Sequence, residues 1–126
     1  MSDISHDEQN QILIVDDEPS IRRSLQRLLQ MKGFSVEVAA DLTAALAAVE
    51  NQRFDVLLVD VILPGIRGPD LAARLQQVQP DLAVIFMSGY PRHALEDVSE
   101  TTHQLVGKPF DMDHLFAAIA AVLERR

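Results

Sequence analysis

The sequence predicts an α/β fold in which a parallel sheet of five strands is covered by helices on both faces. Short apolar runs alternate along the chain with segments whose apolar residues recur every three or four positions. Three of these runs are apolar almost throughout, as expected for central strands that are buried on both faces. The length of 126 residues suits one domain, which would bury roughly two thirds of the surface of the unfolded chain.

Two strand–helix units are predicted in the first half of a domain that spans residues 11–126, after a flexible leader of residues 1–10. We expect strands at Ile12–Val15 and Phe34–Val38. Pro19 opens the first helix and Gly33 ends it, while Asp41 caps a second, alanine-rich helix. The predicted apolar faces are Ile21, Leu25, Leu28 and Leu29 in the first helix, and Leu42, Ala45, Leu46 and Val49 in the second.

Three further strands are predicted in the second half, at Val56–Val59, Leu82–Met87 and Leu105–Val106. The pairs Pro64–Gly65 and Gly68–Pro69 predict a loop over residues 61–68 and, after it, a helix that ends at Pro80. The stretch 91–101 is polar, and its weak periodicity favours a helix only faintly. Asp111 caps the last helix. The predicted apolar faces are Leu71, Leu75 and Val78 in the third helix, and Leu115, Phe116, Ile119, Val122 and Leu123 in the last.

Composition and charge exclude several classes of protein. The chain has no cysteine, which excludes disulfide scaffolds, iron–sulfur clusters and thiol catalysis. Its longest apolar run, Leu115–Leu123, is about half of a membrane span, and its polar, acidic start resembles neither a signal nor a transit peptide. The net charge of −8 disfavours direct binding to nucleic acid or to anionic membranes. We therefore expect a soluble cytoplasmic domain.

Acidic residues follow two strands that the predicted fold makes neighbours. Five such units favour the flavodoxin-like strand order 2-1-3-4-5, in which ligands bind beyond the carboxyl ends of the first and third strands. Asp16 and Asp17 end the first strand and Asp60 ends the third. Three clustered carboxylates repel one another unless a cation neutralises them, and Mg²⁺ suits such a set. The alternative is structural, with Asp16 capping the first helix and Asp60 capping a turn.

Two more strand ends carry groups that suit phosphoryl chemistry. Ser88 follows the fourth strand with a hydroxyl, and Lys108 follows the fifth with a cation beside Pro109. A carboxylate nucleophile, a metal, a hydroxyl and an ammonium are the groups needed to hold a phosphoryl group on an aspartate.

These residues lie in four segments that together resemble the receiver domain of two-component response regulators. The resemblance runs from about Gln11 to Leu123 and is carried by Ile14–Glu18, Leu58–Gly65, Met87–Gly89 and Gly107–Phe110. The wording of Phe86–Tyr90 is similar to that of receivers attached to hybrid histidine kinases. The 2-1-3-4-5 order is itself a recorded property of a chemotaxis regulator of this family.

The resemblance implies a role for each site residue. Asp60 would accept the phosphoryl group, Asp17 would bind Mg²⁺ directly and Asp16 would bind it through water. The main-chain carbonyl of Ile62 would be a further ligand. The remaining implied phosphoryl contacts are the hydroxyl of Ser88 and the ammonium of Lys108. The donor would be a phosphohistidine on a sensor histidine kinase or a histidine phosphotransfer protein, and the output partner is not named by the sequence.

Two positions depart from the family pattern. Leu105 stands where an aromatic side chain usually reports phosphorylation, so Tyr90 is a candidate for the missing aromatic signal. Arg67 stands where a small polar residue is commoner. We expect the output face to persist on the fourth helix, fifth strand and fifth helix.

Two other functions compete with a signalling domain. A metal-dependent phosphatase could use Asp60 as its nucleophile, but it would need an acid–base carboxylate at the position of Ile62 and a cap over its substrate. A flavin mononucleotide binder would need a Ser/Thr-rich phosphate loop after the first strand, where Asp17 and Glu18 repel phosphate. The sequence therefore favours a regulatory domain, not an enzyme, that promotes its own phosphorylation and dephosphorylation.

Overall fold

The computed structural model describes residues 10–88, 104–107 and 111–124. The predicted leader, except for residue 10, and the predicted helix at 91–101 lie outside these residues. In chain order the elements are β1 (Gln11–Val15), α2 (Pro19–Met31), β2 (Ser35–Ala39), α3 (Leu42–Asn51), β3 (Val56–Asp60), β4 (Ile62–Leu63), β5 (Ile66–Arg67), α4 (Gly68–Val78), β6 (Ala83–Ser88), β7 (Gln104–Gly107) and α6 (Met112–Glu124).

The main sheet confirms the predicted strand order. Its five strands run β2-β1-β3-β6-β7, and every neighbouring pair is parallel. In the register of the central strands, Val15 lies beside Val59 and Asp60 lies beside Met87. The carboxyl ends of β1, β3 and β6 therefore meet at one edge of the sheet.

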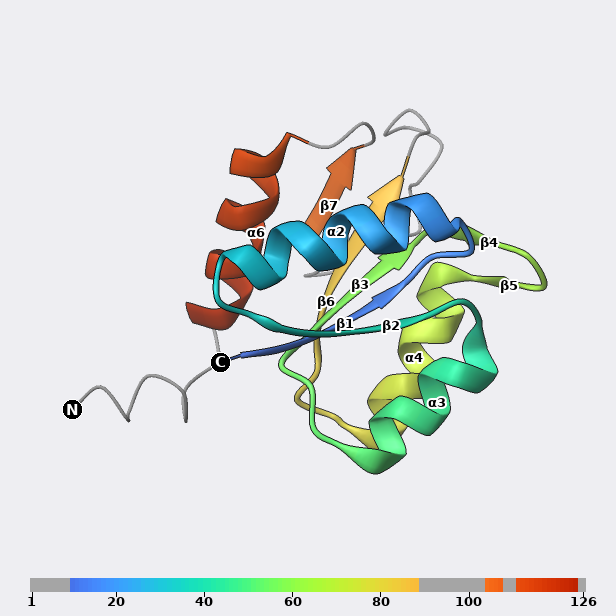
Figure 1. The fold of residues 1–126 in the computed structure, drawn as a ribbon. Coiled ribbons are helices and arrows are strands. Elements are labelled where there is room, and N and C mark those ends of the chain that lie inside the picture. The colour runs from blue at the N-terminus through green and yellow to red at the C-terminus, as the bar shows by residue number, and fades with distance from the viewer. Residues whose placement is uncertain (1–9, 89–103, 108–110, 125–126) are drawn as a thin grey trace.

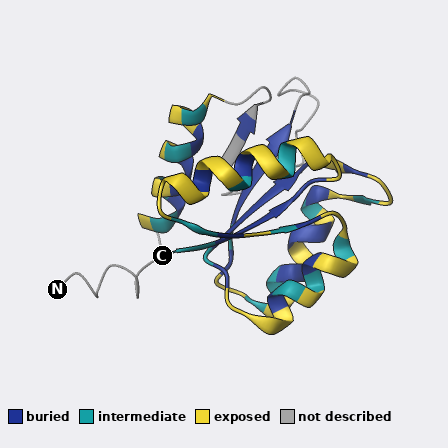
Figure 2. Ribbon diagram, viewed as in Figure 1, coloured by how far each residue is buried: buried dark blue, intermediate teal, exposed yellow. Residues whose placement is uncertain are grey.

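Helices cover the sheet on both faces (Figure 1). One face packs against α3 and α4 through side chains such as Val49 and Leu71, and the other packs against α2 and α6 through side chains such as Leu29 and Ile119. The strands β1 and β3 are dark blue in Figure 2 because all but one of their residues, Gln11, are buried. Two apolar cores thus hold the central strands, whose register fixes the carboxyl edge of the sheet.

The helix ends follow the sequence signals. Pro19 occupies the first turn of α2, and its last turn closes in a Schellman motif with Gly33 at φ 101°. In that motif the Phe34 N–H donates to the Leu29 carbonyl at 3.1 Å, so Phe34 belongs to the cap and β2 begins one residue later than expected. The carboxylate of Asp41 accepts the Ala44 N–H at 2.9 Å, which confirms the predicted cap of α3.

Gln79 joins three segments at the edge of the sheet opposite the carboxyl ends of the strands. Its Nε2 donates to the carbonyls of Val49 at 2.9 Å and Gln52 at 2.6 Å, and its Oε1 accepts the Phe54 N–H at 2.9 Å. One side chain at the end of α4 therefore ties down the end of α3 and the entry to β3.

Three sequence predictions were wrong in detail. Leu28 and Val78 are 38% and 41% exposed and lie outside the cores, because each buried helix stripe is narrower than its run of apolar residues. Residues 61–68 are not an irregular loop, because β4 and β5 pair as an antiparallel hairpin within them. Gly65, at φ 83°, follows Pro64 at the tip, as a type II turn requires.

Among the described residues, no helix is long and apolar enough to cross a membrane.

Candidate functional site

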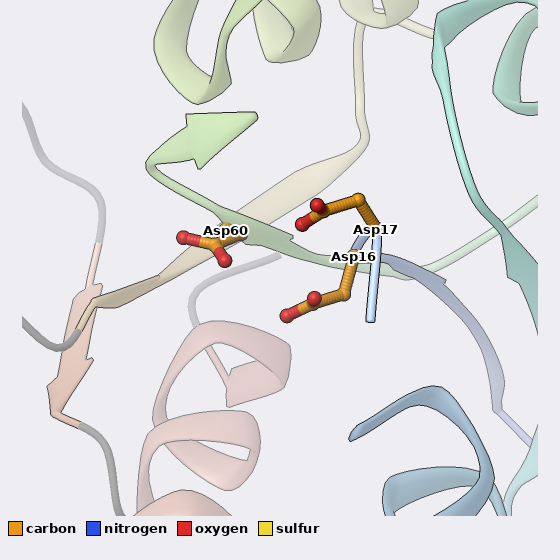
Figure 3. A group of neighbouring side chains, drawn as sticks. All are labelled: Asp16, Asp17 and Asp60. Atoms are coloured by element: carbon orange, nitrogen blue, oxygen red, sulfur yellow. The ribbon is translucent and has the colours of Figure 1, made fainter. Parts of the chain in front are cut away.

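Three aspartates meet at the carboxyl edge of the central strands. Asp16 and Asp17 directly follow β1, and Asp60 is the last residue of β3. One carboxylate oxygen from each lies within 4.8 Å of the others. Figure 3 shows the three side chains gathered at the ends of β1 and β3 and extending toward the same side. The predicted carboxylate cluster is therefore present, and in the described part of the chain no other group of three acidic or histidine side chains is close enough to share an ion.

Asp16 is the most deeply buried member of the cluster. It has no exposed surface, and its Oδ1 accepts the Glu18 N–H at 2.9 Å. The residue at the helix cap is Glu18 rather than Asp16, so the structural alternative of a helix-capping Asp16 is wrong. The main-chain carbonyl of Asp16 accepts a hydrogen bond from Arg22 Nη1 at 2.7 Å. Arg22 on α2 thus fixes the peptide that joins the two aspartates, a contact that the sequence did not reveal.

Asp60 is 8% exposed, and its side chain is oriented by the backbone two residues further along the chain. Its Oδ1 accepts the Ile62 N–H at 3.1 Å, as the alternative of a turn-capping aspartate expects. This local contact coexists with the cluster, because the same carboxylate also takes part in the three-aspartate group. Asp17 differs from both neighbours in being exposed. The site therefore has two buried carboxylates and one that faces solvent.

Gly68 holds the backbone of Asp60 in place. Its N–H donates to the Val61 carbonyl at 2.7 Å, which closes the β4–β5 hairpin at its base. A Cβ atom at this position would lie 2.3 Å from the Asp60 carbonyl oxygen and 2.9 Å from the Val61 Cα. The start of α4 thus approaches the end of β3 so closely that only glycine fits. The sequence itself predicted only that Gly68 lies at the start of a helix. The sequence signal for its role beside Asp60 was the presence of a glycine eight residues after Asp60.

The other predicted site residues are only partly within the described structure. Ser88 is the last residue of β6 and is 2% exposed, and its position is one residue beyond the pairing of Asp60 with Met87. Lys108 and Tyr90 lie outside the described residues. Leu105 is in β7, where its backbone pairs with Phe86, and its side chain lies outside the description.

The family model for the response regulator receiver domain matches residues 12–120. The chain belongs to this family. It is a receiver domain of the two-component response regulators, a regulatory class of domain that is phosphorylated on an aspartate with Mg²⁺.

Curated relatives of this receiver domain are longer proteins. The response regulator MprA of Mycobacterium sp. (strain KMS) is 34% identical over 121 residues, which cover 90% of this chain and 50% of that protein. The transcriptional regulatory protein TcrA of Mycobacterium tuberculosis is 34% identical over 116 residues, which cover 90% of this chain and 46% of that protein. The chain thus spans about half the length of these relatives.

Solved structures of receiver domains superpose closely on this one. The response regulator TrrA of Thermotoga maritima, in complex with Mg²⁺ and BeF, has a TM-score of 0.80 and 30% identity over 91% of this chain and 100% of that one. The receiver domain of the hybrid histidine kinase CckA has a TM-score of 0.77 and 34% identity over 90% of this chain and 99% of that one. These similarities confirm the fold and the family.

Proposed function

We propose that Asp60 of this receiver domain accepts a phosphoryl group from a phosphohistidine, and that the modification switches a partner-binding face. The observation that carries the proposal is the group of three carboxylates at the ends of β1 and β3, whose oxygens lie within 4.8 Å of one another. Ligands of doubly wound sheets bind at this edge, so the position of the carboxylates supports a binding site.

The donor set fits Mg²⁺. The cluster offers hard carboxylate oxygens, and its exposed member, Asp17, leaves one side open to water and to a substrate oxygen. We assign Asp17 and Asp60 as direct ligands, Asp16 as a ligand through water, and the main-chain carbonyl of Ile62 as a further ligand. When bound, Mg²⁺ would offset the mutual repulsion of the carboxylates and the negative charge of the phosphoryl oxygens.

Asp60 would act as the nucleophile. Because its Oδ1 accepts the Ile62 N–H, we assign the attack on phosphorus to Oδ2. The bond from Oδ2 to phosphorus forms while the phosphorus–nitrogen bond of the phosphohistidine breaks, and the electron pair of that bond stays on the imidazole nitrogen. The buried placement of Ser88 supports a hydroxyl contact to the phosphoryl group, and we assign Lys108 as its counter-ion.

Asp60 sits at the end of a buried strand whose register is fixed on both sides, so the carboxylate is positioned before any partner arrives. This preorganisation supports a domain that promotes its own phosphorylation and dephosphorylation. The competing phosphatase needs an acid–base carboxylate two residues after the nucleophile. The side chain there is Ile62, which is 40% exposed and cannot transfer a proton.

The partners follow from the chemistry. The phosphoryl donor would be a sensor histidine kinase or a histidine phosphotransfer protein in the cytoplasm. We propose that the output face includes β7 and α6, with Tyr90 contributing and Leu105 replacing the usual aromatic. The receiver itself would make no direct contact with nucleic acid or membrane, in keeping with its net charge of −8.

The test is labelling of the purified chain by acetyl phosphate or beryllium fluoride, followed by intact-mass and NMR analysis. We expect labelling that requires Mg²⁺, that disappears in Asp60→Asn and that persists in the control Asp81→Asn, an exposed aspartate after α4. Labelling that survives Asp60→Asn, or that needs no divalent metal, overturns the assignment. Chemical-shift changes that stop at the phosphorylation loops, or that are unaltered by Tyr90→Ala, overturn the output proposal.

A further inference from the structure

The β4–β5 hairpin presents one apolar and one cationic side chain on its outer face. Ile62 pairs with Arg67, and Leu63 pairs with Ile66. Paired residues of an antiparallel ladder project on the same side, and successive pairs alternate. Leu63 is 8% exposed and Ile66 packs against the core, whereas Ile62 is 40% exposed and Arg67 is exposed. Arg67 therefore stands beside Ile62 on the outer face.

This outer face adjoins the phosphoacceptor. The Ile62 N–H donates to Asp60 Oδ1 at 3.1 Å, so residue 62 borders the carboxylate directly. Cβ atoms of directly paired residues lie about 5 Å apart, so the Cβ atom of Arg67 lies about 5 Å from that of Ile62. The Gly68 N–H bond to the Val61 carbonyl, at 2.7 Å, holds the next residue against the same segment. Two neighbouring contacts thus keep the backbone of Arg67 next to the site.

The negative charge of the domain makes a cation beside the site important for anionic phosphodonors. The chain carries a net charge of −8, and three carboxylates gather at the site. Small acyl phosphates are anions, so the field of the domain opposes their approach. A cation on the hairpin that borders Asp60 lowers that barrier, and its effect on a dianion is larger than on a monoanion.

We propose that Arg67 is a specificity-determining residue that favours small dianionic acyl phosphates as phosphodonors to Asp60. The inference rests on the proposed function of Asp60 and adds to it the substrate class of direct phosphorylation. In that reaction the bond between phosphorus and the acyl oxygen breaks, the bond between phosphorus and Asp60 Oδ2 forms, and the carboxylate leaves with the electron pair. Arg67 acts before this step, on the encounter.

The experiment measures the second-order rate constant for phosphorylation by acetyl phosphate at saturating Mg²⁺ in wild type, Arg67→Gln and Arg67→Glu. The matched controls are Arg53→Gln and Arg53→Glu, which change the net charge equally at an exposed residue ahead of β3. The four steps of β3 from Val56 to Asp60 span about 13 Å, and Arg53 lies three residues before Val56, so it is more than a Debye length from Asp60 at 0.1 M salt. A single charge acting on a dianion at about 10 Å in water changes the rate about 4-fold.

We therefore expect a fall of about 4-fold in Arg67→Gln and about 15-fold in Arg67→Glu at low salt. High salt should reduce both effects to less than about 2-fold. Phosphoramidate, a less charged donor, should show the smaller loss. At low salt the more distant Arg53→Gln should lose only about 2-fold, and each Arg53 variant should lose less than the matching Arg67 variant. Equal losses at the two positions, equal losses for the two donors, or a loss that salt does not change would overturn the proposal. Wild-type labelling and its absence in Asp60→Asn test the underlying function separately.

Discussion

Gly68→Ala should impair phosphorylation far more than it impairs folding. The added Cβ would lie 2.3 Å from the Asp60 carbonyl oxygen, whereas real Cβ atoms essentially never come closer than 3.0 Å to such a neighbour. The obstacle is backbone rather than a flexible side chain, so the start of α4 or the end of β3 must move by about 0.7 Å. Asp60 lies on one of these two segments.

The magnitude of each effect follows from that displacement. Overpacking of this kind costs about 1–3 kcal/mol in the free energy of unfolding. For a domain of this size the melting temperature should fall roughly 3–5 °C for each kcal/mol. A misplacement near 1 Å can reduce a rate about 100-fold, so we expect labelling by acetyl phosphate to slow by about 10- to 100-fold.

The matched control is Gly65→Ala at the tip of the same hairpin. Gly65 has φ 83°, so alanine is strained there by about 1–2 kcal/mol, yet its Cβ meets no atom within 4 Å. Both variants should lose stability in thermal denaturation, and only Gly68→Ala should lose most of its labelling rate. Wild-type labelling by folded Gly68→Ala, or an equal loss in Gly65→Ala, would refute the steric argument.

Three further variants test other contacts. Asp16→Asn keeps the acceptor for the Glu18 N–H but removes one of the clustered charges. It should therefore raise the melting temperature without Mg²⁺ and reduce the stabilisation that added Mg²⁺ gives. Equal shifts of the melting temperature by Mg²⁺ in variant and wild type would exclude a shared cation site. Arg22→Gln removes a 2.7 Å bond to the Asp16 carbonyl and should cost about 1–2 kcal/mol together with slower labelling, measured by urea denaturation and intact mass. Gln79→Ala removes three hydrogen bonds at the amino-terminal edge of β3 and should lower the free energy of unfolding by about 2–4 kcal/mol. The labelling rate of the folded protein should not change, and slower labelling would mean that the two edges of the sheet are coupled.

The sheet and the carboxylate cluster were predictable because their signals are local. The strands β1, β3 and β6 are apolar except for one terminal residue each, and only strands buried on both faces of a sheet need that composition. Once the strand order is fixed, the residues after β1 and at the end of β3 must be neighbours. Asp16, Asp17 and Asp60 then follow without knowledge of any side-chain contact.

The contacts that hold the cluster in place could not be predicted in the same way. Strands of two residues, such as β4 and β5, carry no periodicity, so the hairpin had no signal beyond Pro64 and Gly65. The role of Gly68 depends on how closely α4 approaches β3, which is a tertiary distance. Leu28 fits the helical period as well as Leu29, and only the packing of α2 leaves the first exposed and the second buried.

The burial of β1 and β3 also sets how the site responds to slow opening motions. We expect amide hydrogens in the middle of such strands to exchange with solvent at free energies near that of global unfolding, whereas an outer strand or a surface hairpin can open alone. Asp60 is the last residue of one of these strands, and Asp16 follows the other. Transient fraying elsewhere would therefore leave the two buried carboxylates side by side. The strands that carry the cluster are thus expected to be among the last parts of the domain to open.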